Sequence, residues 1–189
     1  MPRLLFVTII SSYIFLIMEI VLAIAKRSRK KSVKRKNDRG SLMLIWIAIA
    51  FSLTAGFFMA KHEAWVFINY LFALIGIAMF LTGMVIRWMS IIQLKKAFTV
   101  DVAITREHQL KTDGLYKLVR HPSYLGLLLI MTGLSAGMNT LQSFFIVTIP
   151  VSAALLYRIS VEEKILKDEF GSGYFDYAKK TRRIIPLIY

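Results

Sequence analysis

The sequence predicts an all-α fold, an integral membrane helical bundle with about five transmembrane helices, and three observations predict it. The chain has 189 residues and is 57% hydrophobic, whereas roughly half of the residues in a soluble domain are apolar. The apolar residues gather in runs close to the roughly 20 residues that a helix needs to cross a bilayer. The formal net charge is +14, and the Lys and Arg residues responsible for it lie mainly between those runs, as expected for loops on one side of a membrane.

Five apolar runs define the expected spans. The first is too long for the core of a signal peptide, and no small-residue cleavage site separates it from the basic stretch that follows, so we expect it to remain in the protein. The last two are short and closely spaced, which predicts a tight helical hairpin that tilts little or is shielded by the other helices. The spans are Leu4–Ala25, Leu42–Ala60, Trp65–Ile86, Tyr124–Gly137 and Leu141–Tyr157.

The cations predict the direction of these spans. Nine Lys or Arg residues lie between positions 26 and 39, and more fill the loop from Arg87 to Arg120 and the tail after Tyr157, whereas the two intervening turns hold only Lys61. Positive-inside bias therefore puts the N-terminus outside, and both basic loops and the C-terminal tail in the cytoplasm. We expect the cluster at 26–39 to attract anionic membrane lipid rather than nucleic acid.

The chain is expected to have two parts. Residues 1–100 hold the first three spans and the basic cytoplasmic loop 26–41. Residues 101–189 hold the last two spans and a cytoplasmic tail helix. The polar motifs described below lie almost entirely in this second part, so we expect it to form the core of the functional site.

Several kinds of site are not indicated by the sequence. The chain has no cysteine, which excludes disulfides, thiolate metal sites and a cysteine nucleophile. His62, His108 and His121 are far apart and show no HxxxH or HxxE spacing, so we expect no metal centre. Neither a GxGxxG motif nor a P-loop is present, which argues against a Rossmann domain and an NTPase. Glu19, inside the first span, is expected to pair with Lys26 or to reach the interface rather than to act in catalysis.

A polar cluster, Arg120-His121-Pro122-Ser123-Tyr124, stands directly before the fourth span. Polar groups at a membrane boundary are costly unless they contact water, headgroups or a ligand, so the cluster marks a candidate site. The alternative is that Arg120 and His121 only flank the membrane and that Pro122 only begins a helix. A helix start offers free backbone N–H groups, where a ligand carboxylate could be held.

A second polar segment follows the fifth span. Arg158 and Glu162 are four residues apart and therefore share one face of a helix. The alternative is an ordinary surface ion pair worth about 0.3–0.5 kcal/mol. Because the fourth and fifth spans form a hairpin, both segments should lie at one depth and could enclose a polar pocket at the cytoplasmic end.

Taken together, these motifs resemble the isoprenylcysteine carboxyl methyltransferase family and the related phospholipid methyltransferases. The resemblance covers about Asp101 to Pro186. It implies a multi-span helical enzyme that binds S-adenosylmethionine (S-adenosyl-L-methionine) on its cytoplasmic side, without a Rossmann domain. The motifs are His108-x-Leu110, Gly114-x-Tyr116, Arg120-His121-Pro122-Ser123-Tyr124, Arg158-x-x-x-Glu162-Glu163, Phe170-Gly171-x-x-Tyr174-x-x-Tyr177 and the late Pro186.

The resemblance also implies roles for individual residues. Arg158 corresponds to the substrate-binding position and, with Glu162, to the catalytic pair. Lys111 stands where the family usually has an apolar residue, and Asp101 lies in a region that contacts the cofactor in some members. The implied cofactor contacts are His108, Gln109, Leu110, Tyr116, His121, Pro122, Ser123, Tyr124 and Glu162.

The chemistry of methyl transfer suits these residue types. A carboxylate acceptor is already anionic and needs only positioning and removal of water. Arg158 could hold one carboxylate oxygen, and Tyr116 or Tyr124 could face the sulfonium of the donor. The implied substrate is a lipophilic small molecule or a lipidated chain held by the membrane.

Three alternatives remain at this point. A phospholipid headgroup amine would have to lose a proton before attack, with Glu162 or His121 as the base. An NADPH enzyme similar to the sterol reductases has related C-terminal helices. A non-enzymatic lipid-binding protein would rely on the Lys26–Arg39 cluster instead.

Overall fold

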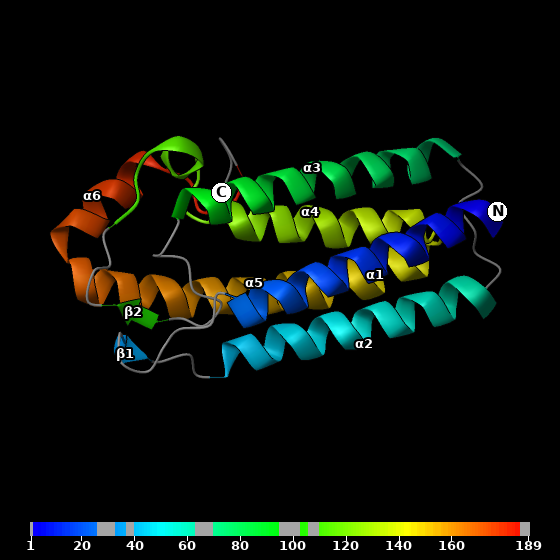
Figure 1. Cartoon of the computed structure of the whole chain (residues 1–189), viewed down its shortest axis with the longest axis horizontal. Helices are drawn as coiled ribbons and strands as arrows, with labels where there is room; N and C mark the ends of the chain where they lie inside the picture. Colours follow the sequence, from blue (N-terminus) through cyan, green and yellow to red (C-terminus); the bar gives the residue numbers. More distant parts are fainter. Residues whose placement is uncertain are drawn as a thin grey trace.

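The computed structural model describes residues 2–25, 33–36, 40–62, 70–94, 103–105 and 110–185. Five long helices run side by side in an elongated bundle, and the smaller elements gather at one end of it (Figure 1). In chain order the elements are α1 (Pro2–Ala25), β1 (Val33–Lys36), α2 (Ser41–His62), α3 (Tyr70–Leu94), β2 (Ala103–Thr105), the 3-10 turn η2 (Gly114–Lys117), α4 (Pro122–Gly137), α5 (Leu141–Phe170) and α6 (Ser172–Lys180).

The all-α membrane fold is confirmed. Within the described residues, α1, α2, α3 and α5 are long and apolar enough to cross a membrane, and α4 is a shorter apolar helix. Each of the five expected spans coincides with one of these helices. The start of the third span, at Trp65, lies outside the described residues.

Two helices extend further than their apolar runs. α3 continues beyond Ile86 to Leu94, and α5 continues beyond Tyr157 to Phe170. No Gly or Pro interrupts either extension, and the added part of α5 is rich in Glu and Lys, which favour helix. Both extensions carry polar side chains of the candidate site.

A short two-stranded ribbon, which the sequence pattern does not predict, joins the two basic loops. β1 pairs antiparallel with β2, with Val33 opposite Thr105, Arg35 opposite Ile104 and Lys36 opposite Ala103. Strands of 4 and 3 residues are too short to show a reliable alternation of polar and apolar residues. The ribbon lies at the end of the bundle that carries α6 (Figure 1).

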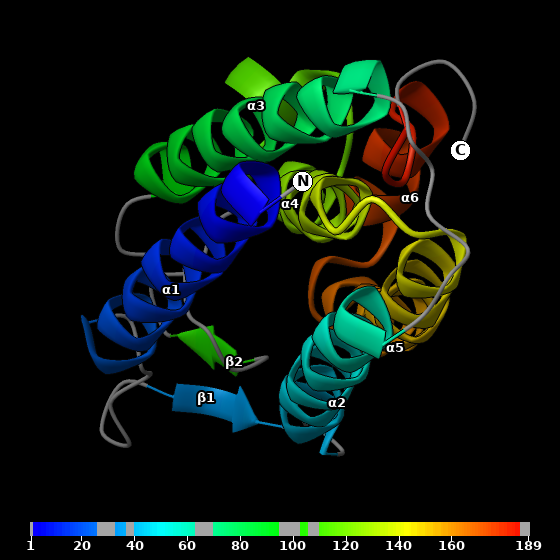
Figure 2. The same cartoon turned by 90° about the vertical axis from the view of Figure 1, so that its right-hand side faces the viewer.

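α4 is the central helix of the bundle (Figure 2). Eleven of its 16 residues are buried, which explains how a helix shorter than a full span is accommodated, because other helices rather than lipid surround it. All five long helices contribute to one apolar core: Phe15, Ile45, Ile49, Phe80, Leu127, Ile130, Met131, Leu134, Met138, Val147, Val151, Ala154 and Leu155.

Glycines bring α3 and α4 into backbone contact. A Cβ added at Gly83 would lie 2.7 Å from the carbonyl oxygen of Gly126, and one added at Gly76 would lie 2.8 Å from that of Gly133. Each helix repeats its glycine after seven residues, so both glycines share a face. Small residues allow this close approach between membrane helices. The contact fixes α4, whose first turn begins the candidate site.

Gly83→Ala should destabilise the bundle. The added methyl group has no space, and overpacking of this kind costs about 1–3 kcal/mol. Gly173→Ala is the matched control, because a Cβ at Gly173 meets nothing within 4 Å. It should leave stability unchanged or raise it by up to about 1 kcal/mol. Thermal unfolding in detergent, followed by circular dichroism, measures both, and equal melting temperatures would contradict the proposed glycine contact.

Candidate functional site

The turn before α4 is anchored on the end of α3. Gly114 adopts a φ of +60°, and a Cβ there would lie 2.5 Å from Gln93 Oε1. The amide of Leu115 donates to that same Gln93 oxygen at 3.0 Å. The ring of Tyr116 is buried beneath the turn, and its hydroxyl donates to the carbonyl of Ser90 at 3.4 Å. Burial raises the pKa of Tyr116, so this hydroxyl stays protonated.

The first turn of α4 presents the polar cluster to the interior. Pro122 is at the helix start, and His121, Pro122 and Ser123 are buried. The rings of His121 and Tyr124 stack with centroids 5.6 Å apart. Among the described residues, His121 Nε2 has no hydrogen-bond partner, although it lies 3.4 Å from Glu163 Oε1. A buried imidazole nitrogen in this state is suited to meet a ligand.

The second polar segment meets the first through Tyr124. Its hydroxyl donates to Glu162 Oε2 at 2.7 Å and accepts from Arg158 Nε at 3.2 Å. Arg158 also donates from Nη1 to Ser41 Oγ at 2.8 Å. One chain of polar contacts therefore joins α2, α4 and α5. Arg158 is only 2% exposed, so the alternative of an ordinary surface ion pair is wrong.

Glu163, next to Glu162, is a buried acceptor for the turn and the tail. Glu163 Oε1 accepts from Arg120 Nε at 3.0 Å, and Oε2 accepts from Arg183 Nη2 at 2.8 Å. The sequence motif includes Glu163 but predicts no role for it. Consecutive helical residues point about 100° apart, so the two carboxylates face different partners.

A buried ion pair lies beneath the first turn of α4. Arg87 donates from Nε to Glu19 Oε1 at 2.6 Å and from Nη2 to Glu19 Oε2 at 2.7 Å. Its third nitrogen donates to Ser123, to the carbonyl at 3.1 Å and the hydroxyl at 3.2 Å. The pair thus ties α1 and α3 to the helix start that carries His121.

This pair corrects two expectations. Arg87 does not belong to a cytoplasmic loop, because α3 continues past it and buries its side chain. Glu19 is expected to pair with Lys26 or to reach the interface; Lys26 lies outside the described residues, and the partner present is Arg87. A buried carboxylate needs a close cation to offset its desolvation, and a bidentate guanidinium supplies it.

The tail after α6 runs beside the turn. Arg120 N donates to the carbonyl of Arg182 at 2.8 Å, and His121 N donates to that of Arg183 at 3.1 Å. The Tyr177 hydroxyl donates to the carbonyl of Tyr116 at 2.6 Å. Burial raises the pKa of Tyr177 to about 12, so it remains a donor at neutral pH.

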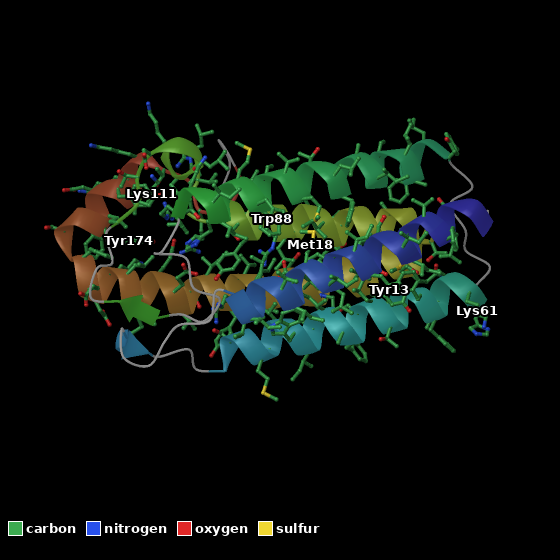
Figure 3. The ribbon with its side chains drawn as sticks, in the orientation of Figure 1. Tyr13, Met18, Lys61, Trp88, Lys111 and Tyr174 are labelled. Carbon is green, nitrogen blue, oxygen red and sulfur yellow. The ribbon has the colours of Figure 1, made fainter. Side chains whose placement is uncertain are left out.

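Most of the expected site residues gather at one end of the bundle. Figure 3 shows Lys111 and Tyr174 at this end and Lys61 at the opposite end. Lys111 is paired with Asp113 at 2.7 Å, and this ion pair and hydrogen bond lower the pKa of the exposed Asp113. Leu110 is half-buried, whereas His108, Gln109 and Asp101 lie outside the described residues. Within the described residues, no cluster of His, Asp and Glu could hold a metal ion.

The fold and the site define an integral membrane helical protein with a polar network at one end of its bundle. The family model for isoprenylcysteine carboxyl methyltransferase matches residues 74–168, half of the chain. The protein therefore belongs to the isoprenylcysteine carboxyl methyltransferase (ICMT) family. The match includes α4, Arg158, Glu162 and Glu163, whereas Ser41 and Arg183 lie outside it.

Individual relatives agree with this family. The chain is 31% identical to protein-S-isoprenylcysteine O-methyltransferase B of Arabidopsis thaliana over 134 residues, 70% of this chain and 66% of the relative. It is 34% identical to protein-S-isoprenylcysteine O-methyltransferase of Schizosaccharomyces pombe over 108 residues, 56% of this chain and 46% of the relative. The chain thus spans less than two thirds of the length of these relatives.

A solved structure shows the same fold. It is that of a eukaryotic intramembrane Ras methyltransferase, isoprenylcysteine carboxyl methyltransferase, with a TM-score of 0.58 and 23% identity. The likeness covers 82% of this chain and 55% of that chain. This arrangement of helices is therefore shared with an intramembrane enzyme.

Glu19→Gln should destabilise the protein by about 3–5 kcal/mol, because it leaves Arg87 as a buried, unpaired cation. The double variant Glu19→Gln/Arg87→Met should recover much of that loss, because no charge remains unpaired. Asp176→Asn is the control, since it removes an exposed pair with Lys179 at 3.4 Å that contributes little. Unfolding in detergent measures all three, and additive effects of the two substitutions would contradict the pairing.

Proposed function

We propose that this protein transfers a methyl group from S-adenosylmethionine to a carboxylate on a lipophilic acceptor. The observation that carries the proposal is the contact of Tyr124 with both Arg158 and Glu162, which unites the two family motifs in a single site. The relatives from Arabidopsis thaliana and Schizosaccharomyces pombe are named as O-methyltransferases of protein S-isoprenylcysteine, which is consistent with methyl transfer to an oxygen of a lipidated acceptor.

The residues of the turn and of α5 fit the donor. The start of α4 offers a positive dipole end, which suits the carboxylate of the donor. His121 Nε2, buried without a hydrogen bond among the described residues although 3.4 Å from Glu163 Oε1, could bind a polar group of the donor, and Glu162 could accept from its amino or ribose groups. His108, Gln109 and Leu110 are expected to complete the site. When bound, S-adenosylmethionine supplies an electrophilic methyl group, whose bond to sulfur breaks as the acceptor oxygen forms the new ester bond.

Arg158 is suited to hold the acceptor. A guanidinium can grip a carboxylate through charge-assisted hydrogen bonds, and Ser41 and Tyr124 fix its orientation from two sides. A carboxylate is ionised at neutral pH, so no general base is required. The protein's part is therefore to align the acceptor and to keep water from it.

The surrounding lipid favours acceptors that carry an apolar tail. Large apolar side chains are exposed along α1, α2 and α3, where they would face lipid. The apolar tail of a lipophilic small molecule or a lipidated peptide would remain in the bilayer while its carboxylate meets Arg158. We place the site on the cytoplasmic face and the N-terminus outside, because the sequence concentrates Lys and Arg in the two loops and the tail that alternate with the turn containing Lys61.

A carboxylate fits better than an amine. A phospholipid headgroup amine is a cation at neutral pH, and a buried arginine beside the acceptor position would repel it. An amine would also need a base, and the Glu162 carboxylate already accepts from Tyr124. The same buried arginine gives no specific support to a lipid-binding protein without catalysis.

Purified protein in lipid nanodiscs should bind S-adenosylmethionine saturably in calorimetry, and His121→Ala and Glu162→Gln should weaken that binding. Arg158→Ala should keep the donor affinity but lower kcat/KM for an S-prenylated cysteine by about 10- to 100-fold, the cost of one hydrogen bond to a charged group. Incorporation of labelled methyl groups measures the second effect.

Lys164→Ala is the matched control, an exposed cation on the same helix, and should behave as the wild type. The acceptor series includes the same prenylated cysteine as an amide, which should not react, and phosphatidylethanolamine. Folded protein that binds NADPH but not S-adenosylmethionine would refute the proposed function. Methylation of phosphatidylethanolamine alone would refute the carboxylate.

A further inference from the structure

The two consecutive glutamates of α5 divide their contacts between different parts of the site. Glu162 faces Tyr124, at 2.7 Å. Glu163 instead faces the turn before α4 and the C-terminal tail, and its side chain is only 4% exposed. A shift of Glu163 would therefore change the position of the turn relative to Glu162, although the described hydrogen bonds of Glu163 go to Arg120 and Arg183 rather than to Tyr124.

Arg120 connects one oxygen of Glu163 to the end of α6. Its Nε donates to Glu163 Oε1 at 3.0 Å, and its Nη1 donates to the carbonyl of Ala178 at 3.0 Å. A cation at a helix C-terminus satisfies carbonyl groups that have no partner within the helix. Arg120 thus joins α5, α6 and the turn from one direction.

Arg183 connects the other oxygen of Glu163 to the helix start. Its Nη2 donates to Glu163 Oε2 at 2.8 Å, and its carbonyl accepts from His121 N at 3.1 Å. One tail residue therefore fixes His121 against the carboxylate of α5. The side chain is 32% exposed, so it can be replaced without opening a cavity in the core.

We propose that Arg183 is a positioning residue for the donor. It would hold His121 and the start of α4 at the distance from α5 that donor binding requires, and it would raise donor affinity without touching the donor. This inference rests on the proposed function, because it presumes that the donor lies between His121 and Glu162. It also assigns a role to the C-terminal tail, beyond the residues that the family model matches.

Arg182 provides an unusually close control. It is adjacent in the tail and has the same side chain, but that side chain is exposed and makes no hydrogen bond or ion pair with the described residues. Its contacts with the turn are made by the backbone: its carbonyl accepts from Arg120 N, and its amide donates to the carbonyl of Leu118 at 3.3 Å. Replacement of either arginine by alanine keeps these backbone contacts and removes one positive charge.

Arg183→Ala should raise the Kd and KM for S-adenosylmethionine by about tenfold, the loss of one charge-assisted hydrogen bond, while kcat and the acceptor KM stay near wild type. Arg182→Ala should leave all four constants unchanged. Arg183→Lys, which keeps the charge and one donor, should restore part of the affinity. Calorimetry with S-adenosylmethionine and labelled-methyl kinetics measure these values on full-length protein in nanodiscs, with melting temperature as a check on folding.

Three results would overturn the inference. Wild-type donor affinity in Arg183→Ala would show that the tail does not position the site. Equal weakening by Arg182→Ala and Arg183→Ala would show an effect of net charge. A lower melting temperature and kcat with unchanged donor Kd would show a purely structural role. If the wild type itself does not bind S-adenosylmethionine, the proposed function fails instead, and this outcome is recognised before any variant is compared.

Discussion

The rest of the site is organised around the hydroxyl of Tyr124, because this group forms hydrogen bonds with both Arg158 and Glu162. Both contacts require α4 and α5 to keep a fixed separation and rotation. The glycines of α3 and α4 allow the backbones of these two helices to approach closely. Arg87 holds the first turn of α4 through Ser123. The polar network is therefore a product of helix packing, and a small displacement of α4 would break it.

The same constraint acts on two buried carboxylates near the site. Glu19 is paired with Arg87, and Glu163 is paired with both Arg120 and Arg183. In surroundings that exclude water, an unpaired charge is costly and a paired one interacts strongly. Groups that are held in this way need little reorganisation when a ligand arrives, which is the condition under which fixed charges favour a reaction. The same buried ion pairs therefore stabilise the fold and hold the side chains of the site in place before a ligand binds.

The sequence predicts the five helices because each is marked by an apolar run, and it predicts the two polar segments because their motif spacing is local. The contacts that it misses join residues far apart in the chain. Glu19 and Arg87 are 68 residues apart, and their pairing depends on how far α3 extends and on which face of α1 is buried. Ser41, Glu163 and Arg183 gain their partners only when α2, α5 and the tail converge. Neither hydrophobic periodicity nor a local motif predicts which distant segments come together. An acidic or basic residue inside a span does indicate that it has a partner, although not which one.

In the proposed function, the turn before α4 and the extension of α5 form two walls of one donor site. A structure of the protein in lipid with S-adenosylhomocysteine bound is the decisive test of this arrangement. The ligand should contact both His121 and Glu162, with Arg158 beside the sulfur. A ligand bound elsewhere, or one that touches the turn while Glu162 remains out of reach, would contradict it.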